Sequence, residues 1–396
     1  MKKVVVVGGG FGGIKAALEL ANNQNFNVTL VSDRLSFRYY PSLYHTATGG
    51  RRVQTDIPLQ RIFDQKNVTL LQGEAKKLHR TDKQLELADG SIVVYDTLIL
   101  SLGVVTNYFG IEGLESYSYG IKSVEQAEEL KAHLHEHMLD EGKPDANYLV
   151  VGGGPTGIEL AGALPAYIKQ IMKNHGVHRK AVNVTIIEAM PQLLPRLPKK
   201  TSKAVQKRLR KLGVKVLLGQ KVEGQNADAL VVNGKPIKSN TVVWTAGVTN
   251  HPFFKKNNFA LNERGKVTVN QLLAAEDDIY VLGDNAATPF SGLAQTALHD
   301  AISVTANLKL EAAGKSPKIY TPKPIVSVIP VGEGWAAVNW GKLKFGGSVG
   351  WALRSAADWI AFKDLEPFWQ ATAQWATEFG DQEYCTICST PLKNKS

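Results

Sequence analysis

The sequence has only two cysteines among its 396 residues, Cys385 and Cys388, both within the last dozen positions. This scarcity excludes a disulfide framework and favours a reducing compartment. Their C-x-x-C spacing is that of half a metal site or of a redox pair, but a zinc site needs two more ligands and no convincing second pair exists. We therefore predict no metal site and leave the role of the two cysteines open.

Long hydrophobic runs are also missing. No window contains the roughly 18 consecutive apolar residues that a membrane-spanning helix needs. The basic start at Met1 to Lys3 leads into Val4–Val7 and then three glycines, which predicts a strand and a turn and not a signal peptide. With 44% apolar and 21% charged residues, the composition is typical of a globular protein, soluble or peripherally attached to a membrane.

Basic residues outnumber acidic ones by 46 to 36, for a net charge of +10. Such a protein can meet nucleic acid, an anionic membrane surface or a negatively charged small molecule. The densest basic stretch, 199–215, is interpreted as the solvated face of one amphipathic helix and its exit. Because no stretch interleaves basic residues with exposed aromatics, we do not predict nucleic-acid binding.

The most informative feature is a pattern of strand, glycine turn and helix that occurs twice, 144 residues apart. The first copy joins the apolar run Val4–Val7 to the turn Gly8–Gly13, and the second joins Tyr148–Val151 to Gly152–Gly157. A G-x-G-x-x-G turn between a strand and a helix is the fingerprint of dinucleotide binding. The sequence therefore predicts an α/β fold with two Rossmann-like domains.

Each glycine in such a fingerprint has its own physical role. The first permits the tight turn, the second lets the backbone approach a pyrophosphate, and the last lets the helix pack close to its strand. The helix N-terminus then offers unpaired N–H groups to the phosphates. The glycines predicted to bind the cofactors are Gly8, Gly10, Gly12 and Gly13 in the first copy, and Gly152, Gly154 and Gly157 in the second.

An acidic residue should follow the second strand of each unit, where it accepts hydrogen bonds from the adenosine ribose. In the first unit, Ser32 and Asp33 follow the strand 27–31, and Asp33 lies 20 residues beyond Gly13. In the second unit, Glu188 follows the strand 182–187. An acid at this position repels a 2′-phosphate, so NADH is favoured over NADPH.

Between the two fingerprints the sequence is rich in short strands. The runs Val68–Leu71, Gln84–Leu87 and Ser91–Val94 predict a small antiparallel insert, with Asp89-Gly90 as a hairpin turn.

The region 331–380 contains six of the seven tryptophans. Pro367 is predicted to divide it into two helices, roughly 349–364 and 367–379. Tryptophan suits a membrane interface, because its ring is apolar and its N–H stays hydrated.

Charged side chains such as Arg354 and Asp358, however, make this region more polar than a strong membrane anchor. A dimer interface and helices that cover another domain are the alternatives to membrane contact.

Taken together, these residues resemble the flavoproteins with two dinucleotide-binding domains, and within them the type II NADH:quinone oxidoreductases. The resemblance runs from Met1 to about residue 330 and continues, with weaker similarity, to about residue 380. The stretches that carry it are Val6–Gly13, Pro41–Tyr44, Ala47–Gly49, Val151–Leu164, Val243–Val248, Ile279–Asp284 and Ala294–Ala297.

The resemblance implies FAD in a discontinuous domain, 1–115 and 265–330, NADH in 116–264, and a C-terminal domain, 331–396. FAD would lie on the first fingerprint and NADH on the second with Glu188, and the catalytic residues would be Glu159, Gln295 and His299. A plain helix-terminal acid is the alternative for Glu159. The other cofactor contacts that the resemblance implies are Ser32, Asp33, Gly103, Asp284 and Ala294 for FAD, and Ala246 and Gly247 for the nicotinamide.

The chain departs from the family pattern at three places. Ser101-Leu102-Gly103 replaces Ala-Thr-Gly, Ser32 falls where the ribose-binding acid is usual, and His299 replaces a second glutamine. His299 is interpreted as a hydrogen-bond partner of a quinone carbonyl, as a proton donor, or as a structural histidine.

The resemblance predicts a peripheral NADH dehydrogenase on the cytoplasmic face of the membrane, which passes electrons from NADH through FAD to a quinone without pumping protons. The oligomeric state is left open between a monomer and a homodimer. Two alternatives remain: a flavin reductase with a soluble acceptor such as a ferredoxin, or a flavoprotein that senses NADH and binds partners.

Overall fold

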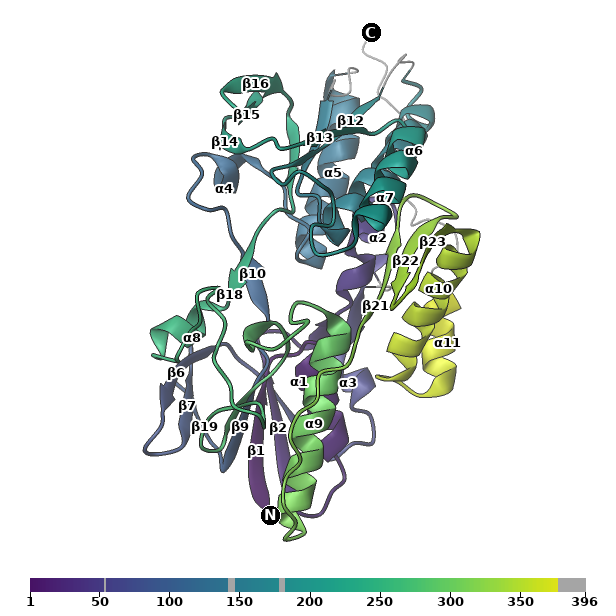
Figure 1. Cartoon of the computed structure of the whole chain (residues 1–396). Helices are drawn as coiled ribbons and strands as arrows, with labels where there is room; N and C mark the ends of the chain where they lie inside the picture. The colour runs from purple at the N-terminus through teal and green to yellow at the C-terminus, as the bar shows by residue number, and fades with distance from the viewer. Residues whose placement is uncertain (53–54, 142–146, 178–181, 377–396) are drawn as a thin grey trace.

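The computed structural model describes residues 1–52, 55–141, 147–177 and 182–376 (Figure 1). One parallel sheet lies in the lower half of Figure 1 and a second in the upper half, while the last strands and helices lie along the right side. Cys385 and Cys388 lie outside the described residues.

The first sheet has six strands in the order β19-β20-β9-β1-β2-β5. All neighbours are parallel except β19, which pairs antiparallel with β20. The central strands are near-continuous apolar runs because both faces of the sheet are covered. The strands are β1 (Lys2–Val7), β2 (Phe26–Ser32), β5 (Val68–Gln72), β9 (Thr97–Leu100), β19 (Ala274–Glu276) and β20 (Ile279–Val281).

Alternate residues of β1 face different layers of the core. Val4 and Val6 pack with α1 (Phe11–Leu20) and α9 (Ala294–Ala312), which contact each other along one face. Val5 and Val7 pack on the opposite face, with the small sheet of β6 (Ala75–His79), β7 (Gln84–Leu87) and β8 (Ile92–Val94) and with α8 (Pro252–Lys256).

The prediction that Val68–Leu71 belongs to the antiparallel insert is wrong. These residues form β5, the parallel edge of the main sheet, with Val68 opposite Val28. The third strand of the insert is instead β6, whose sequence has no clear alternation. A register shift between Ala75 and Lys77 puts Ala75 and Leu78 in the core, three positions apart, so the period of two is lost.

The second sheet has four parallel strands in the order β13-β12-β11-β17, and a three-stranded insert of β14, β15 and β16 follows β13. The predicted α/β fold with two Rossmann-like units is therefore confirmed. The elements of this half are α5 (Val124–Glu141), β11 (Asn147–Val151), α6 (Pro155–Asn174), β12 (Asn183–Glu188), α7 (Lys199–Lys211), β13 (Lys215–Leu218), β14 (Val222–Gln225), β15 (Ala229–Val232), β16 (Lys235–Lys238) and β17 (Thr241–Trp244).

The chain passes between the two halves at β10 (Val104–Thr106) and returns at β18 (Val248–Asn250). These two strands pair antiparallel and lie between the halves in Figure 1. The remaining short elements are β3 (Ser36–Arg38), η1 (Tyr40–Ser42), α2 (Leu43–Ala47), β4 (Asp56–Pro58), α3 (Leu59–Ile62), α4 (Leu114–Tyr117) and η3 (Gly283–Asn285).

The C-terminal part is a three-stranded antiparallel sheet followed by two helices: β21 (Val326–Pro330), β22 (Ala336–Trp340), β23 (Leu343–Gly347), α10 (Ser348–Lys363) and α11 (Phe368–Ala376). The predicted division at Pro367 is confirmed. The indole N–H of Trp359 donates to Thr372 Oγ1 at 3.2 Å and so ties α10 to α11. Within the part of the chain that the structure describes, no helix is both long and apolar enough to cross a membrane.

Candidate functional site

The two glycine turns have the same backbone geometry. Gly8 has a φ of +115° and Gly152 a φ of +116°, values that residues with a side chain rarely adopt. A Cβ on Gly8 would overlap the carbonyl oxygen of Ser101, and a Cβ on Gly152 would lie 2.8 Å from the Cα of Ala246. Both turns therefore require glycine for conformation and for space.

The third residue of each turn, which is the second glycine of the G-x-G-x-x-G pattern, faces open space. A Cβ on Gly10 or Gly154 would meet no atom within 4 Å, and these residues are the N-caps of α1 and α6. At Gly13 and Gly157, by contrast, a Cβ would overlap the carbonyl oxygen of the turn's own first glycine. The protein thus packs tightly below each turn and leaves room above it, beside the free N–H groups of a helix N-terminus. This arrangement fits a pyrophosphate.

We call Gly8–Gly13 with Ser32 the first cradle, and Gly152–Gly157 with Glu188 the second cradle. Glu188 is the last residue of β12, and its carboxylate accepts the N–H groups of Gly153 at 2.6 Å and Met190 at 2.7 Å.

In the first cradle Ser32 ends β2 and is buried. Asp33 follows it, with 63% of its side chain exposed and its carboxylate 3.5 Å from Arg34 Nε. Asp33, the acid that the sequence predicts for the ribose, therefore lies one residue beyond the position that Glu188 occupies in the second cradle.

The ends of β9 and β20 are joined by Asn285, a residue that was not predicted from the sequence. Asn285 accepts the N–H of Gly103 at 2.9 Å and donates to its carbonyl at 2.6 Å. Asp284 precedes it, and Lys266 Nζ donates to the Asp284 carbonyl at 3.1 Å. Burial lowers the pKa values of Lys122 and Lys266, while the nearby Asp284 carboxylate opposes that shift. The Asn directly after Gly-Asp was the available signal.

Ala246 and Gly247 follow β17 at the second cradle. A Cβ on Gly247 would lie 2.5 Å from the ring of Phe109, so the ring rests directly on this backbone. Trp244 beneath them donates its indole N–H to the carbonyl of Asn107 at 2.9 Å.

Glu159 lies on α6 and is 8% exposed. Its nearest charged partner is Arg354 of α10, with 3.5 Å between Glu159 Oε1 and Arg354 Nη1. Arg354 is held more closely elsewhere: its Nε is 2.7 Å from Asp358, and its Nη2 donates to the Pro41 carbonyl at 3.1 Å. Tyr39 completes the group by donating its hydroxyl to Asp358 at 2.5 Å.

In these buried surroundings the pKa of Glu159 is raised to about 7. Burial is the main cause and the charge of Asp358 adds to it, whereas Arg354 opposes the shift. The direction follows from the geometry, because one guanidinium serves two buried carboxylates and its short contact is with Asp358.

From the sequence, Arg354 and Asp358 were interpreted only as charges that weaken a membrane anchor, and Tyr39 was not predicted to be a functional residue. In the structure Arg354 and Asp358 form an i,i+4 pair on the inner side of α10 and reach the first half of the chain. Opposite charges four residues apart in an otherwise apolar helix were the available signal.

Gln295 and His299 lie one turn apart near the start of α9, which begins at Ala294. The Gln295 amide exchanges two hydrogen bonds with the backbone of Val326 at the start of β21, at 3.1 and 3.2 Å. His299 Nδ1 is buried without a hydrogen-bond partner among the described residues, and burial lowers the pKa of His299. Within the described part of the chain, neither residue forms a hydrogen bond to Glu159. Strand β21 runs between them, from Gln295 towards α6.

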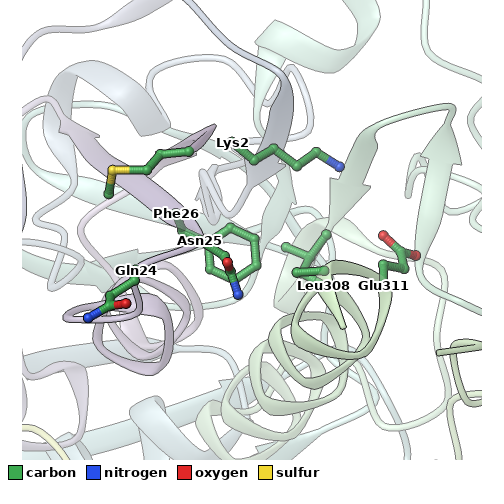
Figure 2. Close-up of a pocket in the computed structure, with 8 residues that line it drawn as sticks. Lys2, Gln24, Asn25, Phe26, Leu308 and Glu311 are labelled. Atoms are coloured by element: carbon green, nitrogen blue, oxygen red, sulfur yellow. The ribbon is translucent and has the colours of Figure 1, made fainter. Parts of the chain in front are cut away.

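A cavity of about 340 Å³ lies at the opposite end of the first sheet (Figure 2). Lys2, Phe26, Leu308 and Glu311 line it, at the amino ends of β1 and β2. Dinucleotides bind at the carboxyl ends of parallel strands, so this cavity is not one of the cradles. The described residues include no group of three or more potential metal ligands.

The family model for pyridine nucleotide-disulphide oxidoreductases matches residues 2–301, and the chain belongs to this family. The predicted oxidoreductase class is thereby confirmed, and the predicted cofactors, FAD and NADH, are supported. The matched segment contains no cysteine, so it has no redox disulfide of its own.

Curated relatives include the type II NADH:quinone oxidoreductase of Staphylococcus saprophyticus, 29% identical over 72% of this chain and 75% of the relative. That of Staphylococcus aureus is 28% identical over 80% of this chain and 84% of the relative. They confirm the predicted resemblance.

Solved structures show the same fold. The structure of NDH2 from Plasmodium falciparum in complex with NADH has a TM-score of 0.83 at 17% identity, covering 96% of this chain and 97% of that one. The sulfide:quinone oxidoreductase of Aquifex aeolicus has a TM-score of 0.78 at 19% identity, covering 98% of both chains.

Proposed function

We propose that this chain oxidises NADH and reduces a quinone through bound FAD, as a peripheral NADH dehydrogenase that pumps no protons. The observation that carries this proposal is the pair of cradles with the same glycine geometry, one in each parallel sheet. The type II relatives support quinone as the acceptor. FAD, when bound, would take the hydride of NADH and pass two electrons to the quinone, so the protein supplies binding, orientation and protons.

In this proposal FAD occupies the first cradle, with its phosphates on the N-terminus of α1. Gly103 and Asp284 border its path along the strand ends, and Ala294 begins the helix beside it. NADH occupies the second cradle, where Glu188 meets the adenosine ribose and Ala246 and Gly247 border the nicotinamide.

The domain division that we propose is 1–115 with 265–330, 116–264, and 331–396. Strands β19 and β20 support the discontinuous first domain, since they complete its sheet. Helix α8 is an exception to this division. It lies within 116–264 but packs on the first sheet through Phe253 and Phe254.

Three side chains are assigned to the quinone end of the reaction. With a pKa of about 7, the Glu159 carboxyl holds a proton in part of the population at neutral pH and can release it to a quinone oxygen. His299 is largely neutral, because burial lowers its pKa, so we assign it a hydrogen bond to the quinone and not proton donation. Gln295 holds β21 in place through Val326 and so shapes the wall of this region.

We further propose that the protein attaches to the cytoplasmic face of the membrane through its C-terminal region. Large apolar side chains are exposed there, including Trp369 at 71% and Leu343 at 61%. Helix α7, which contacts β22 and β23, carries seven basic residues and no acidic one, and it suits anionic lipid. Co-sedimentation with phosphatidylglycerol vesicles tests this. Loss of vesicle binding in a Leu343→Glu, Trp369→Glu double variant supports the proposal. A wild-type protein that is dimeric and does not bind the vesicles would instead show that these side chains contact a second copy of the chain.

The reaction is tested by anaerobic stopped-flow absorbance at the flavin band. Bleaching on addition of NADH, followed by rapid recovery on a short-chain quinone, is the expected result. Recovery with a ferredoxin but not with quinone would replace the acceptor, and bleaching without turnover on either would favour the NADH-sensing alternative. A protein that takes up no FAD would refute the proposal as a whole.

A further inference from the structure

The two cradles differ at the residue that ends their second strand. In the first, Val7 lies opposite Val31 and the N–H of Gly8 donates to the Val31 carbonyl at 2.8 Å. In the second, Val151 lies opposite Ile187, and Gly152 donates to the Ile187 carbonyl at the same distance. The next residues along, Ser32 and Glu188, are therefore structurally equivalent.

Both equivalent side chains face the middle glycine of their turn. A Cβ on Gly9 would lie 2.5 Å from Ser32 Oγ, and a Cβ on Gly153 would lie 2.8 Å from Glu188 Oε2. The Glu188 carboxylate accepts the N–H of Gly153, but the shorter Ser32 side chain does not do the same. The N–H of Gly9 has no acceptor within the described part of the chain.

Asp33 is not placed to supply the missing carboxylate. The backbone before and after it is held against the end of β5, because Gly73 donates to the Ser32 carbonyl at 2.8 Å and the Gln72 amide donates to the Asp33 carbonyl at 3.4 Å. The exposed Asp33 side chain lies beside Arg34, which also contacts Glu125 at 3.5 Å.

We propose that residue 32 sets the affinity of the first cradle, and that Ser32 makes this protein bind FAD more weakly than it would with a glutamate at that position. The identity of the ligand rests on the proposed function. A serine hydroxyl gives the adenosine ribose a neutral hydrogen bond where a glutamate gives a charge-assisted one. Charged partners strengthen such bonds, and the difference corresponds to roughly tenfold in affinity.

The test compares full-length wild type with Ser32→Glu, which copies the second cradle, and with Ser32→Gln, which has nearly the same size but no charge. The measurements are the Kd of FAD, from quenching of flavin fluorescence, and the rate of FAD release after dilution. Ser32→Glu should lower the Kd about tenfold and slow release correspondingly, and Ser32→Gln should tighten binding less. Equal affinities for wild type and Ser32→Glu, with unchanged circular dichroism, would overturn the proposal.

The variant Asp33→Asn tests the rival assignment, in which Asp33 binds the ribose. Its result does not depend on whether the Ser32 variants fold. A tenfold loss of FAD affinity would make Asp33 the ribose ligand and overturn the proposal, while a change of less than about twofold upholds it. If wild type binds FAD that NADH bleaches, the proposed function stands whichever way the variants rank. If no variant binds FAD, both proposals fail together.

Discussion

Replacing Glu159 by glutamine should flatten the pH dependence of stability between pH 5 and 8. Burial raises the pKa of Glu159 from 4.5 to about 7 in the folded protein, while in the unfolded chain it keeps its ordinary value. Between these values the folded state retains a proton that the unfolded state has lost. The stability from this group is therefore fully present below about pH 4.5 and is lost as the pH rises through about 7.

The expected loss is roughly 3 kcal/mol for a shift of this size. Glutamine resembles the protonated acid in shape and keeps an oxygen towards Arg354, but it cannot ionise. Glu159→Gln and wild type should therefore differ by less than about 1 kcal/mol at pH 5. At pH 8 the variant should be more stable by roughly 2–3 kcal/mol.

The assay is urea unfolding of both proteins at pH 5, 6, 7 and 8, with FAD in excess. Glu333→Gln is the matched control, because Glu333 is an exposed glutamate in the turn before β22. Wild type and the control should lose stability together as the pH rises, and Glu159→Gln should lose roughly 2–3 kcal/mol less between pH 5 and 8. The change that remains in the variant comes from other groups, such as Asp300 and Glu366, whose pKa values burial also raises. Parallel profiles for all three would refute the reasoning, since they would mean that Arg354 keeps Glu159 ionised throughout.

Three further outcomes are expected. Arg354→Met leaves the carboxyl groups of Glu159 and Asp358 buried without their cation, so urea unfolding should show a loss of roughly 3–5 kcal/mol; a loss below about 1 kcal/mol would contradict the buried network. Gly10→Ala should keep the wild-type melting temperature, because its Cβ meets no protein atom. The same Cβ would occupy the space of the pyrophosphate, so the affinity for FAD should fall at least roughly tenfold, and an unchanged FAD titration would contradict the cradle. Glu188→Gln should raise the KM for NADH roughly tenfold with kcat nearly kept, and an unchanged KM in steady-state assays would remove the ribose contact.

The sequence was sufficient wherever a function depends on neighbouring residues. A strand, a glycine turn and a helix N-terminus lie within about 20 consecutive residues, so the two fingerprints predicted both parallel units and their glycine geometry. Pro367 likewise divided α10 from α11, because proline removes a backbone donor at that point whatever surrounds it. The short strand β6 escaped prediction, since its bulge removes the alternation that marks a strand.

Contacts between distant segments were decided only by the tertiary structure. Glu159, Arg354, Asp358 and Tyr39 come from α6, α10 and the segment before η1, and no local pattern states that they meet. Their burial, and with it the raised pKa of Glu159, depends on α10 packing over both halves of the chain. The glycine turns are local because one stretch of backbone builds them, whereas the ionisation of a side chain depends on the solvent and charges that other segments exclude or bring near.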